Sequence, residues 1–266
     1  MKLFQNKKCK YKNAYIFYFC DIINVDGNDF MVKEFIDTIN LDNLDNVIEE
    51  YLELLIARVT YSSMSLEVDL GNPSDAKNAI RFRDNMRAFK FLLANLKNNT
   101  ELSKEIIVKV ADIINSSSFY ISDGYRKIDG KYIAETDIPI SLVENISNDM
   151  KKLLEDYKKW SSNLEMDIFV REALFHLKFI HIHPFEDGNG RTARLLLNFN
   201  LIKDSVAPIV ITDDLLEYYH DYIRNNDVLG LADLFAIQSK KEQYVIDEIV
   251  KERVSAEEKN ESLKKR

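Results

Sequence analysis

One segment in the second half of the chain concentrates side chains that could do chemistry: residues 183–194 have the sequence HPFEDGNGRTAR. His183 can accept a proton near neutral pH, which makes it a candidate general base. Residues 188–190 (Gly-Asn-Gly) allow backbone conformations that bring successive N–H groups close to an anion. Arg191 and Arg194 are three positions apart, so on a helix they would share one face and could clamp phosphates. The segment predicts a diphosphate-binding site with a base beside it.

Two metal hypotheses follow from the same segment. A carboxylate at Asp187 would repel a diphosphate unless a cation lay between them, and Mg²⁺ typically binds one or two carboxylates together with phosphate oxygens. Asp187 is therefore a candidate Mg²⁺ ligand, with capping of the following helix as the alternative. His181 and His183 form an H-x-H pair that raises zinc as a rival. A zinc site usually has a third protein ligand, and His176 and His220 have no supporting cysteine pattern, so we expect His181 to be packed or hydrogen-bonded.

Helices must position these groups. The chain has 7 Gly and 4 Pro in 266 residues, far below the usual usage of about 7% and 5%, and apolar residues recur at helical spacing. We predict an all-α fold. Apolar helices should precede and follow the 183–194 segment, and a short stretch punctuated by Gly124, Gly130 and Pro139 should form a small β-hairpin. The expected helices cover residues 32–60, 76–97, 101–115, 142–160 and 167–180, and a further helix should start near Arg191 and include the apolar residues 195–202.

Composition restricts the environment and the partners. Lys and Arg number 36 and Asp and Glu 44, so the net charge is −8, which does not favour nucleic acid as a partner. Cys9 and Cys20 lack metal-ligand spacing and are expected to be reduced thiols. The basic start and the apolar residues 14–20 could mimic a signal peptide, but the apolar run is short, Asp21 interrupts it and no cleavage site follows. No apolar stretch approaches the ~20 residues of a membrane span. We expect a cytoplasmic protein without a membrane partner.

The motif closely resembles the signature of the Fic family, H-P-F-x-[D/E]-G-N-G-R-x-x-R, without a gap from His183 to Arg194. The resemblance implies an all-α Fic-type helical bundle with a small β-hairpin flap. It also implies a protein adenylyltransferase that moves AMP from ATP to a Ser, Thr or Tyr hydroxyl of a target protein and releases pyrophosphate. The target is not identified by the sequence and could be the protein itself. Whether the chain is a monomer or a homodimer is left open.

The resemblance assigns roles to individual residues. His183 would be the general base, Asp187 would hold Mg²⁺, residues 188–190 and Arg191 would bind the α- and β-phosphates, and Arg194 the γ-phosphate. Residues 124–126 (Gly-Tyr-Arg) and 131–139 resemble the family's substrate-binding flap, with flap residues Ala134, Glu135, Thr136 and Asp137. The nucleotide-binding residues that it implies are Asp187, Gly188, Asn189, Gly190, Arg191, Thr192, Ala193, Arg194, Tyr218 and Asn226.

A second match lies upstream. Ser63 and Glu67 resemble the inhibitory helix of self-restrained Fic proteins, [S/T]-x-x-x-E-[G/N], and at this spacing they share one helix face. Glu67 would pair with Arg194 and occupy the γ-phosphate position. Val68 departs from the expected Gly or Asn, and Ser161 and Glu165 form the same short pattern. An ordinary helix that carries a glutamate is therefore the alternative.

The expected organisation has three parts. Residues 1–105 form an N-terminal helical region with the inhibitory helix at about 60–70, residues 106–238 form the Fic catalytic core, and residues 239–266 form a charged helix or tail. Other nucleotidyl transfer, removal of AMP and a non-catalytic nucleotide-sensing module remain alternatives. Phosphoryl transfer, the activity of the related Doc toxins, is less favoured because their motif has Lys where this chain has Gly190.

Overall fold

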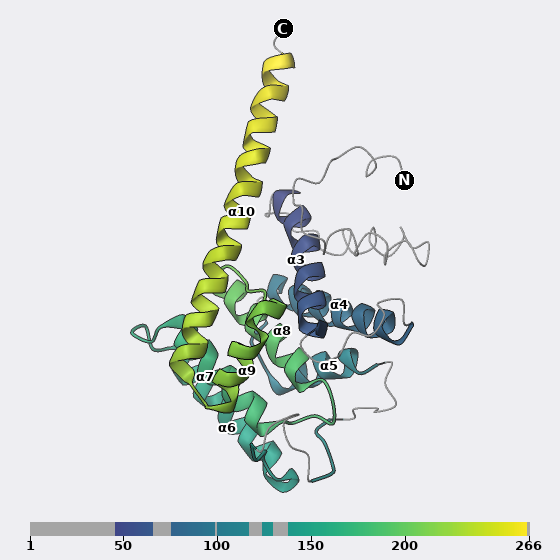
Figure 1. Cartoon of the computed structure of the whole chain (residues 1–266), viewed down its shortest axis with the longest axis vertical. Helices are drawn as coiled ribbons and strands as arrows, with labels where there is room; N and C mark the ends of the chain where they lie inside the picture. The colour runs from purple at the N-terminus through teal and green to yellow at the C-terminus, as the bar shows by residue number, and fades with distance from the viewer. Residues whose placement is uncertain (1–45, 66–75, 99, 117–123, 130–137, 265–266) are drawn as a thin grey trace.

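The protein is a bundle of α-helices in the part of the chain that the computed structural model describes, residues 46–65, 76–98, 100–116, 124–129 and 138–264 (Figure 1). No strand occurs in these residues, so the all-α prediction is confirmed. None of the helices there is long and apolar enough to cross a membrane. The elements are α3 (Asn46–Ser65), α4 (Ala76–Lys97), α5 (Lys104–Ile114), α6 (Val143–Ser161), α7 (Ile168–Ile182), α8 (Asn189–Lys203), η1 (Asp213–Leu215), α9 (Leu216–Arg224) and α10 (Val228–Lys264).

Polar side chains cap the N-termini of several of these helices by accepting hydrogen bonds from their first amides. The Ser103 hydroxyl accepts a hydrogen bond from the Ile106 amide at the start of α5. Asp167 accepts two, from the amides of the second and third residues of α7, at 2.8 and 3.0 Å. The first amide of α6, on Val143, donates to the carboxylate of Asp129 from the preceding loop at 2.7 Å. Such caps satisfy amides that have no partner inside the helix and fix where each helix begins.

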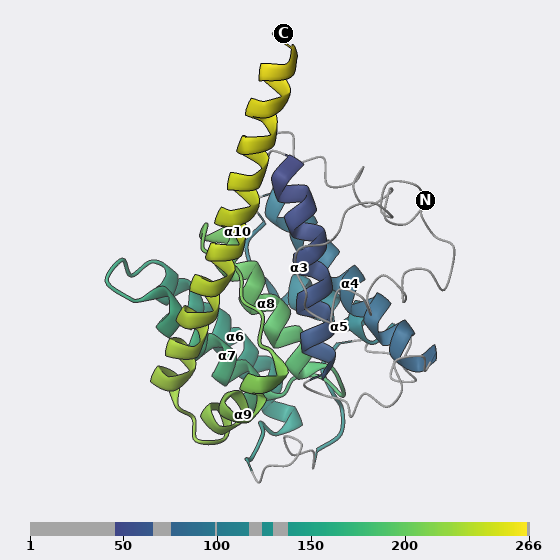
Figure 2. The ribbon, with the colours of Figure 1, turned by 45° about the horizontal axis from the view of Figure 1, so that its top comes forward.

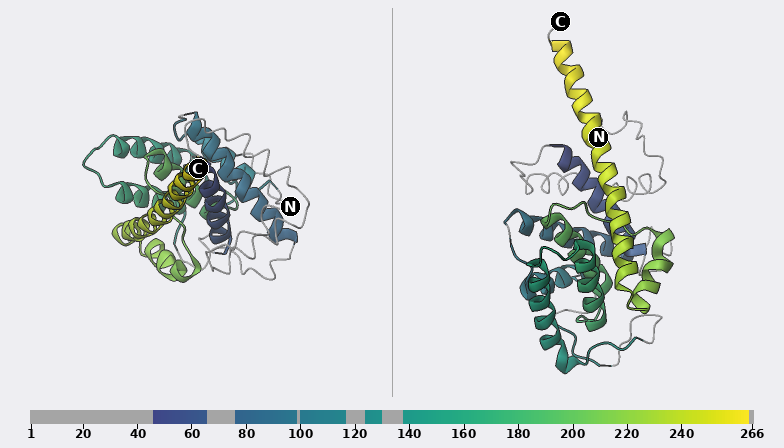
Figure 3. Two further views of the ribbon diagram at one scale, coloured as in Figure 1. Left: turned by 90° about the horizontal axis from the view of Figure 1, so that it is seen from above. Right: turned by 90° about the vertical axis from the view of Figure 1, so that its left-hand side faces the viewer.

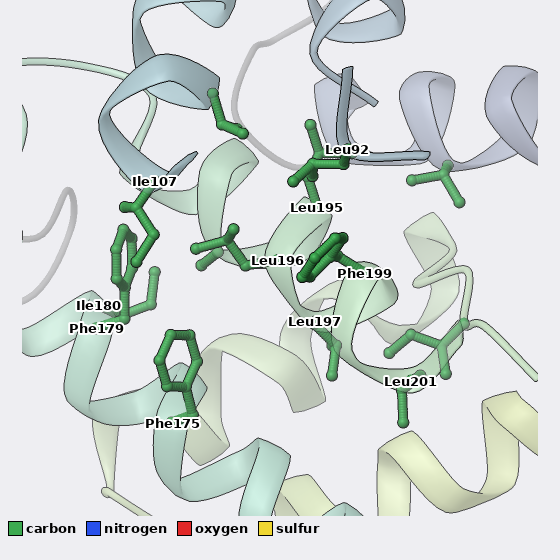
Figure 4. Packing of buried hydrophobic residues seen from close by; sticks show 14 of the residues in the cluster. Leu92, Ile107, Phe175, Phe179, Ile180, Leu195, Leu196, Leu197, Phe199 and Leu201 are labelled. Carbon is green, nitrogen blue, oxygen red and sulfur yellow. The ribbon is translucent and has the colours of Figure 1, made fainter. Parts of the chain in front are cut away.

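Helix α8 lies at the centre of the bundle, in contact with α7 on one side and with α3, α4 and α5 on the other (Figure 2). Nearly every residue from its start to Leu201 is buried. The buried polar side chains, such as Arg194, Asn198 and Asn200, are hydrogen-bonded to neighbouring segments. Its leucines and Phe199 meet side chains of the surrounding helices (Figure 4). The labelled partners are Leu92 of α4, Ile107 of α5, and Phe175, Phe179 and Ile180 of α7. The 183–194 motif thus leads into a helix that is buried along most of its length.

Helix α10 packs on α7, α9 and α3, and its C-terminal part stands clear of the bundle (Figure 3). It continues without a break across position 238, where the sequence analysis placed the end of the core. Among the residues partly buried against the apolar core are Val245 and Ile246, beyond that position. The core likewise includes Leu55 and Phe89 from the region before residue 105. The helices on both sides of residues 106–238 therefore share the apolar core of the predicted catalytic region.

A buried polar network holds α6, α7 and α8 together. Glu172 is fully buried on α7, and its two oxygens accept hydrogen bonds from Tyr157 of α6 and Asn200 of α8, both at 2.8 Å. Arg171 donates to the same carboxylate at 2.8 Å and also pairs with Asp204. Burial raises the pKa of Glu172, opposed by the charge of Arg171 and by these donors. The helix that ends at the candidate base is anchored to both its neighbours by this network.

The predicted β-hairpin is not seen in the described residues of its stretch. Residues 124–129 and 138–142 have no regular secondary structure, and the flap residues 134–137 lie outside the described part of the chain. One reason is that the Ile128 and Ser141 carbonyls accept hydrogen bonds from the Arg126 guanidinium, so these groups do not form a β-ladder. The first half of the helix expected over 32–60 also falls outside the described residues.

Candidate active site

The candidate base stands at a sharp turn at the end of α7. Helix α7 ends at Ile182, and His183 follows in the left-handed conformation, with φ 50° and ψ 59°. This conformation costs a residue other than glycine about 1–2 kcal/mol, so the surrounding contacts must hold it. The His183 amide still donates to the Phe179 carbonyl at 3.0 Å, and its side chain is half-buried. The turn directs the chain from α7 toward the start of α8.

The loop between the two helices is closed by the side chain of Asn189. Its amide group both donates to the Phe185 carbonyl, at 2.8 Å, and accepts from the Phe185 amide, at 2.9 Å. Phe185 itself is fully buried, with its ring 6.2 Å from that of Phe179. The side chain of Asn189 thus fixes the shape of the loop, and its backbone amide belongs to the N-terminus of the next helix.

Helix α8 begins two residues earlier than the sequence analysis expected. Gly188 is its N-cap, with φ +77°, and the helix starts at Asn189 instead of near Arg191. The Thr192 amide makes the first intrahelical bond, to the Gly188 carbonyl at 2.9 Å. The Asn189 and Gly190 amides therefore belong to the first turn, whose N–H groups point out of the helix. This N-terminus, with its positive partial charge, is suited to bind an anion.

Asp187 joins the loop, the cap and α5. Its carboxylate accepts from the Gly188 amide at 2.7 Å and lies 3.2 Å from the Arg191 guanidinium. Its main-chain carbonyl accepts from the Asn115 side chain at 2.9 Å. Asn115, at the C-terminal end of α5, was not singled out from the sequence, because only the fold brings it to position 187. Both carboxylate oxygens of Asp187 thus already have protein partners.

Arg194 is bound by the N-terminal region. Its Nε and one terminal nitrogen donate to the hydroxyl and to the carbonyl of Ser63, both at 2.8 Å. Ser63 lies on α3, 131 residues earlier, and both side chains are buried. The inhibitory pattern pairs Glu67, four residues after Ser63, with Arg194; the contact of Ser63 itself with Arg194 was not predicted. Glu67 lies outside the described residues.

Other predicted nucleotide-binding residues differ in exposure. Thr192 and Ala193 are buried, and Ala193 belongs to the apolar core. Tyr218 of α9 is 59% exposed. Asn226, between α9 and α10, has a left-handed backbone with φ 52° and is exposed. Their roles toward a nucleotide stay predictions.

Two histidines near the site are packed side chains. His181 is half-buried; burial lowers its pKa, and a hydrogen bond to the Ile223 backbone opposes this shift. His176 is fully buried, 2.7 Å from the Tyr219 hydroxyl. Burial, with the nearby charge of Arg194, lowers the pKa of His176 to about 3, so the ring is neutral. Of the three histidines at positions 176, 181 and 183, only His183, directly after α7, lies in the turn that leads to the N-terminus of α8.

The fold and the site define a helical protein with a candidate anion site at the start of its central helix and a histidine beside it. Residues 101–201 match the model of the Fic/DOC family. This part of the chain therefore carries a Fic/DOC-family domain, as the resemblance of the 183–194 motif implied.

Two relatives of the chain are named protein adenylyltransferases. Protein adenylyltransferase fic-1 of Caenorhabditis elegans is 30% identical over 149 residues, which are 55% of this chain and 28% of that protein. Protein adenylyltransferase Fic of Nematostella vectensis is 29% identical over 129 residues, 47% of this chain and 30% of that protein. The matched residues thus span less than a third of these relatives.

Two solved structures share the fold. A Fic domain-containing signaling protein from Bacteroides thetaiotaomicron superposes with a TM-score of 0.71 at 17% identity, covering 83% of this chain and 97% of that one. A single-residue variant of Fic-1 of C. elegans superposes with a TM-score of 0.60 at 19% identity, covering 90% of this chain and 76% of that one. Both align well beyond residues 101–201, so their likeness includes helices outside the family domain.

Proposed function

We propose that this protein is a protein adenylyltransferase that transfers AMP from ATP to a side-chain hydroxyl of a target protein. The observation that carries the proposal is the pairing of His183 with the N-terminus of α8, five residues later, inside a Fic/DOC domain. Relatives named protein adenylyltransferase support this chemistry. A helix N-terminus with two buried arginines suits a polyphosphate, and a histidine beside it suits activation of a hydroxyl.

In the proposed reaction the hydroxyl oxygen of the target attacks the α-phosphorus of ATP. The new oxygen–phosphorus bond forms as the bond from the α-phosphorus to the oxygen that bridges to the β-phosphate breaks, and pyrophosphate leaves. His183 takes the hydroxyl proton. Its backbone turn fixes where the ring stands, and such alignment of a base supplies much of the rate in a transfer of this kind.

The phosphates would be held by the opening of α8. The Asn189 and Gly190 amides offer backbone donors, and Arg191 and Arg194 offer bidentate cationic ones. Asp187 fits a role as a Mg²⁺ ligand because its carboxylate lies directly before the phosphate-binding turn, and Arg191, 3.2 Å from it, could leave it for a phosphate. Among the described residues no three acidic, histidine or cysteine side chains group as metal ligands, so phosphate and water would complete the shell. When bound, Mg²⁺ supplies positive charge to the phosphates.

We further propose that the N-terminal region restrains the enzyme through Arg194. The two hydrogen bonds from Arg194 to Ser63 support this, because they occupy the guanidinium that would bind the γ-phosphate. Glu67 follows Ser63 by four residues and would add a carboxylate partner for the same arginine. ATP would then bind without its γ-phosphate in the productive position.

The test is transfer of label from α-³²P-ATP and, in parallel, γ-³²P-ATP to protein in a cell lysate and to the enzyme itself. Glu67→Gly should raise α-label transfer, and the double variant with His183→Ala should abolish it. Transfer of γ-label only would indicate phosphoryl transfer. Binding of ATP without transfer of either label by the Glu67→Gly variant would contradict the proposal and favour a nucleotide-sensing module.

A further inference from the structure

Arg126 is a buried residue that binds the turn at His183 through both its side chain and its backbone. Its guanidinium Nε donates to the His183 carbonyl at 2.8 Å, and its backbone amide donates to the Pro184 carbonyl, also at 2.8 Å. The residue is 2% exposed. Two successive carbonyls of the turn are thus fixed by one residue that lies 57 positions away in the sequence.

The same guanidinium also binds the two described flanks of residues 130–137. One terminal nitrogen donates to the Ile128 carbonyl at 3.1 Å, and the other donates to the Ser141 carbonyl. The Ser141 amide in turn donates to the His181 carbonyl at 3.3 Å. Arg126 therefore joins three chain segments at one point: residues 126–128, residue 141 and the end of α7.

The chemistry of the contact requires an arginine. Its planar fork presents donors in fixed directions, here to three carbonyls on different segments, whereas a lysine is a single flexible point donor. Burial lowers the pKa of Arg126, and the carboxylates of Asp129 and Glu186 oppose that shift. Asp129, 3.7 Å from the guanidinium, balances part of the charge.

We propose that Arg126 is a positioning residue that holds His183 in its left-handed backbone conformation and so aims the imidazole at the start of α8. This rests on the proposed role of His183 as the base. Arg126 contacts the turn through the main-chain carbonyls of His183 and Pro184. Its loss should therefore reduce the rate of the chemical step and leave the phosphate-binding residues in place.

The test compares Arg126→Met and Arg126→Lys with Arg171→Met, all in the Glu67→Gly background. Arg171 is the matched control: it is a buried arginine on α7 itself, but it pairs with Glu172 and Asp204, away from the turn. Arg126→Met should lower kcat about 100-fold, as expected for a misplaced base, with the KM for ATP changed by less than about threefold. Arg126→Lys should fall in between, and Arg171→Met should lower the unfolding temperature but keep kcat below that temperature.

Equal kcat values in Arg126→Met and Arg171→Met at a temperature where both are folded would overturn the proposal. A loss of kcat accompanied by an equal loss of ATP affinity would do the same, because it would indicate a general collapse of the site. Neither result depends on which protein accepts the AMP, since self-labelling can be followed.

A measurement independent of turnover separates this proposal from the proposed function. Amide hydrogen exchange at residues 183 and 185 should be faster in Arg126→Met than in the parent, and unchanged in Arg171→Met. If no variant transfers AMP but exchange behaves in this way, the function is wrong and the positioning stands. If exchange at the turn is unchanged in Arg126→Met, the positioning is wrong whatever the activity.

Discussion

The charged residues of the motif have protein partners in this structure. Arg191 pairs with Asp187, and Arg194 is bound to Ser63. A buried arginine would be costly without a partner, so each guanidinium needs an acceptor whether or not a phosphate is bound. Binding of ATP would therefore replace the protein acceptor of each guanidinium by a phosphate oxygen. The affinity for ATP would depend on the difference between the free energies of these two interactions.

Gly188 is the residue of the motif whose backbone leaves least room for change. It has φ +77°, and a Cβ there would lie 3.0 Å from the Ile114 side chain and 3.2 Å from that of Asn115. Gly188→Ala should therefore strain the cap by about 1–2 kcal/mol and displace the first turn of α8. We expect ATP affinity, measured by calorimetry, to fall about tenfold or more.

Gly124→Ala is the matched control for this prediction. Gly124 also has a positive φ, +131°, but a Cβ there would meet nothing within 4 Å. This variant should lose some stability through backbone strain and keep its ATP affinity. A similar loss of ATP affinity in both variants would show that the close contacts at Gly188 do not matter for binding.

At the scale of elements, two adjacent serines attach α3 to different parts of the bundle. Ser63 bonds to Arg194 of α8, whereas the hydroxyl of Ser62 donates to the Ile211 carbonyl in the segment after α8. Asn198 of α8 binds the same segment through both backbone groups of Ile209, at 2.7 and 3.0 Å. Helix α3 is thus attached beside the predicted γ-phosphate position, and one of these two serine contacts uses the arginine itself.

Ser63→Ala should weaken the hold on Arg194 and release it for ATP. A hydrogen bond to a charged group contributes about 1.5–3 kcal/mol, and the main-chain contact of residue 63 remains, so we expect ATP affinity to rise about tenfold. Self-labelling should rise with it. Ser62→Ala removes the neighbouring hydroxyl without touching Arg194, so it should lower stability and leave affinity unchanged. The same effect of both substitutions on affinity would contradict the restraint through Arg194.

At the scale of the whole molecule, the interior carries a neutral histidine. His176 lies against Tyr219 of α9 and Phe235 of α10, with ring centroids 5.7 and 5.6 Å away. The pKa of His176 is about 3 in the folded protein and 6.5 for an ordinary histidine. Between these values the unfolded chain binds a proton that the folded chain does not, so unfolding takes up a proton. The stability linked to His176 is complete above about pH 6.5 and is lost as the pH falls toward 3.

Denaturant unfolding measured from pH 7.5 to 5 tests this. The free energy of unfolding should fall with acidification in the wild type, and the slope should be smaller in His176→Gln, which cannot titrate. The substitution itself should lower stability at pH 7.5 because the buried Tyr219 hydroxyl loses or weakens its hydrogen bond. An unchanged slope in His176→Gln would mean that this histidine already titrates normally in the folded state.

The helical class, most helix positions and the order of chemical groups from His183 to Arg194 could be predicted from the amino-acid sequence. These depend on local information: apolar spacing along the chain and the glycines of a twelve-residue segment. The start of α8 was placed two residues late because sequence alone does not show that Gly188, and not Gly190, takes the left-handed cap.

Only the tertiary structure decided which distant groups hold the site. Arg126 lies 57 residues from His183, Asn115 lies 72 from Asp187, and Ser63 lies 131 from Arg194. The inhibitory pattern pairs Glu67 with Arg194, whereas only the fold gives the contacts of Arg126 and Asn115. The physical reason is that both donate to main-chain carbonyls, which every residue has, so no side-chain pattern in the sequence marks the acceptor.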